Sequence, residues 1–355
     1  MTYRLPIKVF DFFSGCGGVS KGFQRAGMEI VFALDYDPES GETFRKNFPQ
    51  ATFLLSDIEN KSDVDKPLKP LIESNRNHLK LFCGCASCQP FTKQNTSHPE
   101  IDNRRTLLGA FQQQIETYLP ELIFVENVPG LQKIEDQTGV FGAFLMALEQ
   151  QGYKKDYGII AAQDFGVPQK RRRLVLIASR LGPIELPKET HGEGSDHPAY
   201  TTVREWIADL PPIAAGESHP SIPNHRAARL SPANLERICA TPAEGDRRSW
   251  PESLKLLCHS KDYQGHTDVY GRMHWEKPAS GLTTRCISLS NGRFGHPTQD
   301  RAISVREAAC LQTFPRDFVF HGSLNSMAKQ IGNAVPVLLA ECFGKHFISH
   351  VKQNL

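Results

Sequence analysis

Short apolar runs and amphipathic stretches alternate along the first half of the chain. The spacing of apolar positions predicts helices over residues 20–26, 39–47, 107–119 and 141–151. Between them lie short apolar runs typical of buried strands, at residues 7–13, 30–34, 52–55, 79–83 and 122–125. Two further strands are expected at one edge, over residues 158–162 and 174–178. This alternation is typical of βαβ units and predicts an α/β domain with a mostly parallel sheet.

The second half of the chain has a different character. Residues 186–288 are rich in Pro, His, Gly and Ser and contain few periodic apolar runs. This composition predicts a second, irregular domain of short strands and loops. The helical pattern returns over residues 304–312 and 334–347.

Composition limits the protein class without identifying it. A chain of 355 residues is long enough for one large or two modest domains, and its net charge of +2 gives no overall nucleic-acid signal. Basic clusters at residues 170–173, 226–229 and 247–248 fit either a solvated surface or phosphate binding. Nine scattered cysteines argue against a disulfide framework and for a reducing cytoplasm. No signal-peptide layout and no membrane-spanning run is evident, so we expect a soluble cytoplasmic protein without a membrane partner.

Glycines and acidic residues follow the first three predicted strands. Gly15, Gly17 and Gly18 lie between a strand and a helix, where they allow a tight turn and close approach of the backbone to a ligand. Asp35 ends the second strand and Asp57 ends the third. Carboxylates at these strand ends can accept hydrogen bonds from ribose hydroxyls and an adenine amine, so the pattern fits a nucleoside. A simple tight turn is the alternative for the glycines alone.

A cysteine follows the fourth predicted strand, in the stretch Cys83-Gly-Cys-Ala-Ser-Cys88-Gln-Pro-Phe. Cys88 opens a polar loop that extends to Arg104, which favours a nucleophilic thiol over a buried structural cysteine. Zinc binding by Cys83, Cys85 and Cys88 is the other alternative. Because no fourth ligand lies nearby, we predict no metal site.

An acid and two arginines complete the candidate chemistry. Glu126 ends the fifth strand, and Arg171 and Arg173 precede or begin the last one. A thiolate can add to an electron-poor ring carbon, a carboxyl that keeps or shares a proton can donate to a ring nitrogen, and a guanidinium can hold a ring carbonyl oxygen. Together these groups fit activation of cytosine at C6, which makes C5 nucleophilic. Arg171 and Gln169 would brace the loop or the phosphate backbone.

Several blocks in this order resemble the motifs of the cytosine-C5 DNA methyltransferase family. Besides the Cys88, Glu126 and Gln169–Arg173 elements, these are Asp11-Phe-Phe-Ser-Gly-Cys-Gly-Gly18, Ser304-Val-Arg-Glu-Ala-Ala-Cys-Leu-Gln-Thr-Phe-Pro315 and Gln330-Ile-Gly-Asn-Ala-Val-Pro336. The blocks span residues 9–337. The resemblance implies a class I methyltransferase fold, Rossmann-like with a mostly parallel sheet, and an inserted irregular target-recognition domain. It suggests a cofactor-binding catalytic domain over residues 1–184, a recognition domain over 185–290, and a C-terminal segment, 291–355, that returns to the first domain.

The resemblance also implies a cofactor, a substrate and a set of site residues. S-adenosyl-L-methionine would contact Phe13, Ser14, Gly15, Gly17, Gly18, Asp35, Tyr36, Asp57, Ile58, Asn333 and Val335. The catalytic residues would be Cys88, Glu126, Arg171 and Arg173, acting on a cytosine flipped out of double-stranded DNA. DNA contacts are expected from Gln89, Thr92, Lys93, Gln94, Arg104 and Gln169. We expect a monomer in a restriction-modification system, with a cognate endonuclease that acts separately.

Two departures from the family pattern and three rival functions stay open at this point. Ser87 stands where proline usually precedes the nucleophile, and Asp35-Tyr36 stands where Glu and Trp are common. Transfer-RNA methylation is disfavoured because the Cys-Phe-Thr element of the RNA branch is missing. Methylation of an exocyclic amine is disfavoured because the nearest match to its motif, residues 209–213, has an inserted leucine and no aromatic residue. A non-catalytic DNA-binding relative would have lost the thiol, the acid or the arginine.

Overall fold

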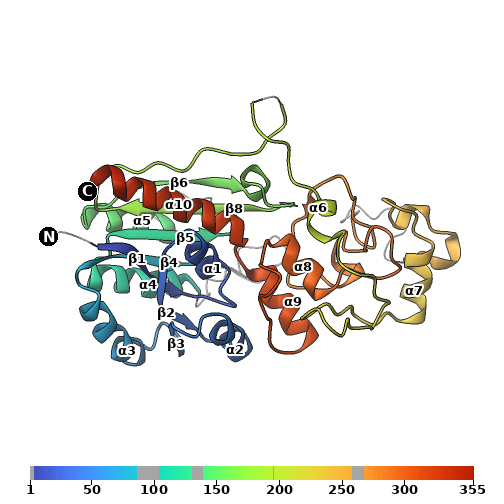
Figure 1. Ribbon diagram of the computed structural model, residues 1–355, viewed down its shortest axis with the longest axis horizontal. Coiled ribbons are helices and arrows are strands. Elements are labelled where there is room, and N and C mark those ends of the chain that lie inside the picture. The colour runs from blue at the N-terminus through green and yellow to red at the C-terminus, as the bar shows by residue number, and fades with distance from the viewer. Residues whose placement is uncertain (1–3, 86–103, 130–138, 195, 258–267) are drawn as a thin grey trace. The chain divides into compact units, whose positions relative to one another are not determined.

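The computed structural model describes residues 4–85, 104–129, 139–194, 196–257 and 268–355 (Figure 1). The first half of the chain alternates strands with helices, as predicted. Its elements are β1 (Arg4–Phe12), α1 (Gly18–Arg25), β2 (Glu29–Asp35), α2 (Pro38–Asn47), β3 (Thr52–Leu55), α3 (Lys61–Ser74), β4 (His78–Gly84), α4 (Arg104–Tyr118), β5 (Leu122–Asn127), α5 (Val140–Gln150), β6 (Lys154–Ala161) and β8 (Arg172–Ser179).

These strands form one seven-stranded sheet in the order β3-β2-β1-β4-β5-β8-β6. Strands β1 to β5 are mutually parallel, and β8 runs antiparallel between β5 and β6. The prediction of a mostly parallel sheet with two further strands at one edge is therefore confirmed. Because the connection reverses direction beside β1, the carboxyl ends of β1 and its neighbours form the edge where α/β sheets bind ligands.

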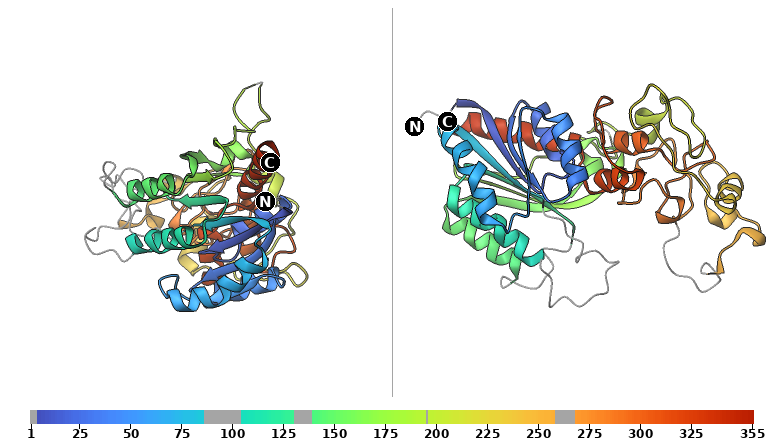
Figure 2. Two further views of the ribbon diagram at one scale, coloured as in Figure 1. Left: turned by 90° about the vertical axis from the view of Figure 1, so that its left-hand side faces the viewer. Right: turned by 90° about the horizontal axis from the view of Figure 1, so that it is seen from below.

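Helices cover both faces of this sheet (Figures 1 and 2). On one face α3, α4 and α5 pack on an apolar core in which Phe12 and Phe111 have ring centroids 5.5 Å apart. On the other face lie α1 and the C-terminal helix α10 (Val337–Asn354), where Phe124 of β5 contacts both Phe23 and Phe343. Burial of phenylalanine from alternate strand positions therefore fixes the layers on each side.

Helix α3 is the one element of this half that the apolar pattern did not predict. Its buried residues Val64 and Leu68 have helical spacing, but Pro67 and Pro70 lie inside the helix. Each proline removes a backbone hydrogen bond and normally ends a helix. Here Val64 and Leu68 belong to the apolar core of the sheet, and this burial offsets the cost of the prolines.

The chain folds into two compact units that do not follow the sequence in simple order. Unit 1 comprises residues 1–161, 172–189 and 335–355, and unit 2 comprises residues 162–171 and 190–334. The chain therefore passes between the units at four points: 161/162, 171/172, 189/190 and 334/335. The division into functional domains at residues 184 and 290 stays a prediction.

Unit 2 contains little regular structure among its described residues. Its only strands there, β7 (Gln169–Lys170) and β9 (Ala279–Ser280), pair in parallel. Its helices are α6 (Val203–Ile207), α7 (Pro232–Cys239), α8 (Val305–Leu311) and α9 (Leu324–Asn333), with short 3-10 turns between them. Ser304 and Glu307 form a capping box that begins α8.

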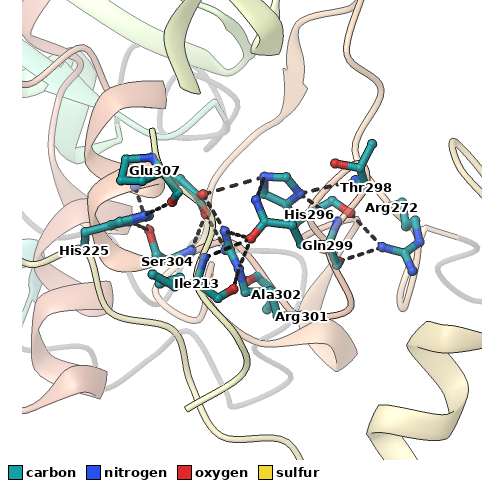
Figure 3. Close-up of polar contacts among 11 residues, drawn as sticks. Ile213, His225, Arg272, His296, Thr298, Gln299, Arg301, Ala302, Ser304 and Glu307 are labelled. Atoms are coloured by element: carbon teal, nitrogen blue, oxygen red, sulfur yellow. Dashed lines mark hydrogen bonds and ion pairs between the residues drawn. The ribbon is translucent and has the colours of Figure 1, made fainter. Parts of the chain in front are cut away.

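Unit 2 contains a buried polar network beside its apolar cluster (Figure 3). Arg301 donates to both carboxylate oxygens of Glu307, at 2.7 and 2.8 Å. His296 accepts the backbone N–H groups of Thr298 and Gln299 on Nδ1, and its Nε2 lies 3.6 Å from Glu307. Because each buried charge has a partner, the network fixes the irregular loops without regular strands.

Candidate functional site

The glycine loop after β1 has backbone angles that its sequence explains. Gly15 and Gly17 adopt φ values of 52° and 96°, and Phe13 also has a positive φ of 67°. A Cβ on Gly17 would lie 2.4 Å from the Phe48 ring, so this position needs glycine for space as well as for conformation. The loop therefore turns sharply at the carboxyl end of β1 and leads directly into α1.

Asp35 joins this loop to the end of β2. Its carboxylate accepts the backbone N–H of Gly15 at 2.7 Å and that of Asp37 at 2.9 Å. Burial raises the pKa of Asp35 above its usual value, and the two backbone N–H groups work against that shift. The next side chain, Tyr36, is 63% exposed. An exposed aromatic ring beside a fixed carboxylate is a suitable surface for stacking a base.

The end of β3 brings a second carboxylate to the same edge of the sheet. The Ser56 N–H donates to the Asp35 carbonyl at 3.1 Å, which ties the two strand ends together. Asp57 is exposed, and its carboxylate accepts only the Glu59 N–H among the described residues. Ile58, in contrast, has its side chain buried in the core. The structure thus brings together Ser14–Gly18, Asp35, Tyr36 and Asp57, the predicted nucleoside contacts of unit 1.

Asp11 is a buried acid at this site that the sequence analysis did not single out. It is fully buried, accepts from Ser20 Oγ at 2.6 Å, and its Oδ1 has no partner among the described residues. Burial raises the pKa of Asp11 to about 7. Ser14 Oγ is likewise buried without a partner in the described part of the chain. Both groups can form a hydrogen bond that the described residues do not supply, so a polar ligand could bind at this loop.

Glu126 and Arg173 meet at the end of β5. Glu126 is buried and lies opposite Val175 in the antiparallel β5–β8 ladder. Arg173 is two residues before Val175, so it projects from the same face of β8. Its Nε lies 2.9 Å from Glu126 Oε1. A carboxylate and a guanidinium are therefore held side by side at a sheet edge.

Cys88 and the DNA-contact candidates Gln89, Thr92, Lys93 and Gln94 lie outside the described residues. Strand β4 ends at Gly84, between β1 and β5, so the segment leading to Cys88 starts next to Glu126. Of the other thiols of unit 1, those of Cys16 and Cys83 are buried, and burial raises the pKa of each. Neither is a suitable nucleophile, because the thiolate is the reactive form.

Gln169 and Arg171 are buried in unit 2 and bind main-chain groups. Gln169 accepts the Leu282 N–H at 3.0 Å and donates to the Leu311 carbonyl at 3.1 Å. Arg171 donates to the carbonyls of Leu282 and Gly332 at 3.1 and 3.0 Å. Both side chains therefore brace unit 2, and the catalytic role of Arg171 and the DNA contact of Gln169 stay predictions.

The remaining candidate residues lie at the ends of helices. Asn333 is exposed at the end of α9, and Val335 is buried ahead of α10. Arg104 begins α4. Among the described residues, no group of three or more His, Cys, Asp and Glu side chains could hold a metal ion.

The mostly parallel seven-stranded sheet with helices on both faces defines an α/β protein of Rossmann-like architecture. The model of the family described as "C-5 cytosine-specific DNA methylase" matches residues 7–349. Type II methylase M.HgiDII of Herpetosiphon aurantiacus is 38% identical over 343 residues, covering 95% of this chain and 94% of that protein. Type II methyltransferase M1.HphI of Haemophilus parahaemolyticus is 33% identical, covering 97% of this chain and 87% of that protein.

The solved structures agree on the fold. A protein described as a DNA modification methyltransferase encoded within an Escherichia coli prophage superposes with a TM-score of 0.70 at 20% identity, covering 98% of this chain and all of that one. The chain therefore belongs to the C-5 cytosine-specific DNA methylase family and is a DNA (cytosine-5-)-methyltransferase with an α/β methyltransferase fold. Such an enzyme needs a methyl donor and acts on DNA. No helix in the described ranges is long and apolar enough to cross a membrane.

Proposed function

We propose that the protein transfers a methyl group from S-adenosylmethionine to C5 of a cytosine flipped out of a specific duplex DNA sequence, through a covalent bond between Cys88 and C6. The observation that carries this proposal is the Glu126–Arg173 pair at the end of β5, beside the strand that leads to Cys88. The pair supplies one group for a ring nitrogen and one for a ring oxygen of the same base.

The residues at the ends of β1 to β3 fit S-adenosylmethionine. Asp35 would accept from the ribose hydroxyls, the exposed Tyr36 ring would stack on the adenine, and Asp57 would accept from the adenine amine. Two observations support the fit: Tyr36 is exposed beside a fixed carboxylate, and Ser14 Oγ is buried without a partner among the described residues. When bound, S-adenosylmethionine would supply an electrophilic methyl group.

The reaction balances with the groups of this chain and the two substrates. The Cys88 thiolate forms a bond to C6, while a proton donated by Glu126 at N3 and the Arg173 guanidinium at O2 stabilise the charge that the ring takes up. C5 then forms its bond to the methyl group as the sulfonium–methyl bond breaks. Loss of the C5 proton to solvent water restores the C5–C6 double bond and expels the thiolate, and N3 returns its proton to Glu126.

Recognition of the DNA sequence is assigned to residues 185–290, and the base must leave the duplex to reach Glu126. The relatives are named type II methylase and type II methyltransferase, which supports a role beside a restriction endonuclease that acts as a separate protein. A monomer is sufficient for this chemistry, because Glu126, Arg173 and Cys88 come from a single chain.

The covalent step is tested with duplex DNA in which every cytosine is replaced by 5-fluorocytosine. Fluorine cannot leave C5 as the proton does, so the wild type should remain attached to the DNA under denaturing conditions. Cys88→Ala should form no adduct, whereas the matched control Cys85→Ala should still form it. An adduct mapped to Cys85, or undiminished methylation by Cys88→Ala, would show that the nucleophile is wrongly assigned. Adduct formation with 5-fluorocytosine RNA but not with DNA would contradict the DNA substrate.

A further inference from the structure

One ion pair of unit 2 joins an exposed guanidinium to a buried carboxylate. The side chain of Arg248 is 75% exposed, while that of Asp246 is 7% exposed. Arg248 Nε donates to Asp246 Oδ1 at 2.8 Å, and Nη2 donates to Oδ2 at 2.7 Å. The carboxylate thus holds the guanidinium along its Nε–Nη2 side. This contact fixes the direction of a side chain that would otherwise move freely in solvent.

Asp246 is itself held by a second arginine. Arg293 Nη2 donates to Asp246 Oδ2 at 3.2 Å, and Arg293 Nη1 donates to the carbonyls of Gly245 and Arg272, both at 3.1 Å. The Arg248 and Arg293 guanidiniums hold the pKa of Asp246 well below its usual range. The carboxylate therefore stays charged at neutral pH and keeps its orientation.

The loop that carries Asp246 is fastened on both sides. Arg272 donates to the Thr241 carbonyl through Nε at 2.8 Å and to the Gly245 carbonyl through its backbone N–H at 3.1 Å. Beyond Arg248, the buried Trp250 donates from Nε1 to Thr241 Oγ1 at 2.8 Å. Arg248 is therefore presented from a short 3-10 turn (η5, Arg247–Ser249) between two anchored residues.

Capping of this turn does not explain the arrangement. The cap needs only the bond from the Arg248 backbone N–H to Asp246 Oδ1, at 3.0 Å. Elsewhere in the described part of unit 2, exposed arginines pair with exposed carboxylates, as in Arg204–Glu276 and Arg316–Asp209. Such surface pairs are weakly ordered. Arg248 differs from these arginines. It is exposed, but its partner Asp246 is buried and also binds Arg293, so the carboxylate fixes the orientation of the guanidinium.

We propose that Arg248 reads a guanine in the major groove of the target sequence. Asp246 binds Nε and one N–H of Nη2. The outer edge, made of Nη1 and the second N–H of Nη2, has no further hydrogen-bond partner among the described residues. That edge matches the O6 and N7 acceptors of guanine, the commonest specific contact of arginine with DNA. Arg248 would thus be a specificity-determining residue, and this role rests on the proposed function, because it requires duplex DNA as substrate.

The experiment compares wild type, Arg248→Ala and Arg248→Lys, each expressed with a plasmid in a bacterial host that lacks cytosine methylation. Lys255→Ala is the matched control, because it removes one exposed positive charge whose partner, Glu252, is also exposed. Bisulfite sequencing of the plasmid gives the methylated sequence for each protein. Both Arg248 variants should methylate sites in which one guanine of the wild-type sequence is replaced. Arg248→Lys should not restore the wild-type specificity, because lysine cannot form two parallel hydrogen bonds with guanine O6 and N7. Lys255→Ala should keep the wild-type pattern.

Purified proteins provide the second measurement. On the wild-type site, Arg248→Ala should lower kcat/KM by about 5- to 150-fold, the range for one bidentate base contact. Replacing the affected guanine by 7-deazaguanine, which lacks the N7 acceptor, should slow the wild type about tenfold and leave Arg248→Ala unchanged. Equal sensitivity of both proteins to every 7-deazaguanine position would overturn the proposal.

The other outcomes are distinct. If Arg248 contacts phosphate, its removal should weaken methylation of all sequences alike and reduce the salt dependence by about one phosphate contact, with no position relaxed. If the Arg248 variants keep the wild-type methylation pattern and rate, the Arg248–Asp246 contact is only a surface ion pair. Either result overturns base reading by Arg248, while the active wild type still supports methylation of DNA. Failure of the proposed function would appear differently, as a wild type that methylates no duplex.

Discussion

Replacing Gly22 by alanine should destabilise the protein, although alanine is the better helix former. Gly22 lies in the interior of α1, where α10 crosses it. A Cβ built there would lie 2.4 Å from Ala340 Cβ, 2.5 Å from the Val337 carbonyl oxygen and 2.7 Å from the Glu341 nitrogen. Two of these three atoms are main chain, so a change of side-chain rotamer cannot relieve the contact. One of the two helices must move.

The magnitude follows from two opposing terms. Carbon atoms in contact are normally about 3.5–4.0 Å apart, so the helices must separate locally by about 1 Å. Inserting one methyl group into a packed interface costs about 1–3 kcal/mol, and contact with backbone favours the upper end. The gain in helix propensity from glycine to alanine is about 1 kcal/mol. We therefore expect a net loss of about 2 kcal/mol in the free energy of unfolding.

Gly109 offers a matched control within the same unit. It also lies inside a helix, α4, but a Cβ there would meet no atom within 4 Å. Gly109→Ala should therefore stabilise the protein by about 0.5–1 kcal/mol. Urea unfolding of both variants and the wild type, followed by circular dichroism, gives the comparison. If Gly22→Ala is as stable as Gly109→Ala, the close contact of α1 with α10 does not exist as described.

Two further predictions concern protonation and cofactor binding. Burial lowers the pKa of His296 to about 4. Between about pH 6.5 and 4 the unfolded state therefore binds a proton that the folded state does not, so the free energy of unfolding should fall with pH, by about 2 kcal/mol at pH 5. Urea titrations at pH 7.5 and 5 should show a smaller loss in His296→Asn, whose Oδ1 can still accept the Thr298 and Gln299 N–H groups; equal losses would contradict this. Asp35→Ala and Asp57→Ala should each weaken S-adenosylmethionine binding by about 1–3 kcal/mol, the cost of an unmet hydrogen-bond partner. If calorimetry finds unchanged S-adenosylmethionine affinity in both variants, the nucleoside binds elsewhere.

The sheet of unit 1 could be predicted from the sequence because its signals are local. Each strand is a short apolar run, and each predicted helix has its apolar residues on one face. Helix α3 was missed because Pro67 and Pro70 are strong local signals against a helix. What offsets them is burial of Val64 and Leu68 in the core of the sheet, and no local pattern reports that burial.

The candidate site was predictable to a similar extent. Residues at strand ends meet because parallel strands end at the same sheet edge, so Asp35, Asp57 and the Gly15 loop come together as expected. The buried state of Gln169 and Arg171 could not be predicted in this way. It depends on backbone atoms of Leu282, Leu311 and Gly332 and on the Gln312 side chain, all more than a hundred residues away.

The polar network of unit 2 was also beyond sequence reasoning. Arg272, Arg301 and Glu307 read as ordinary surface charges, since such residues are mostly exposed in proteins. Their pairing depends on loops whose course no periodicity encodes. Periodic sequence patterns predict helices and strands, whereas unit 2 is stabilised largely by individual polar contacts that leave no periodic pattern in the sequence.

The way Gln169 and Arg171 hold unit 2 bears on how such an enzyme acquires a new DNA target over evolution. Every residue type presents the same N–H and carbonyl at position 282, except proline, which lacks the N–H. The segment before Leu282 can therefore diverge freely in side chains while these bonds persist. Gly332 is the exception, because a Cβ there would lie 2.1 Å from the Thr283 carbonyl oxygen. With recognition assigned to residues 185–290 as proposed, exchange of that segment should succeed wherever the donor keeps the backbone path at 282–284, whatever its side chains.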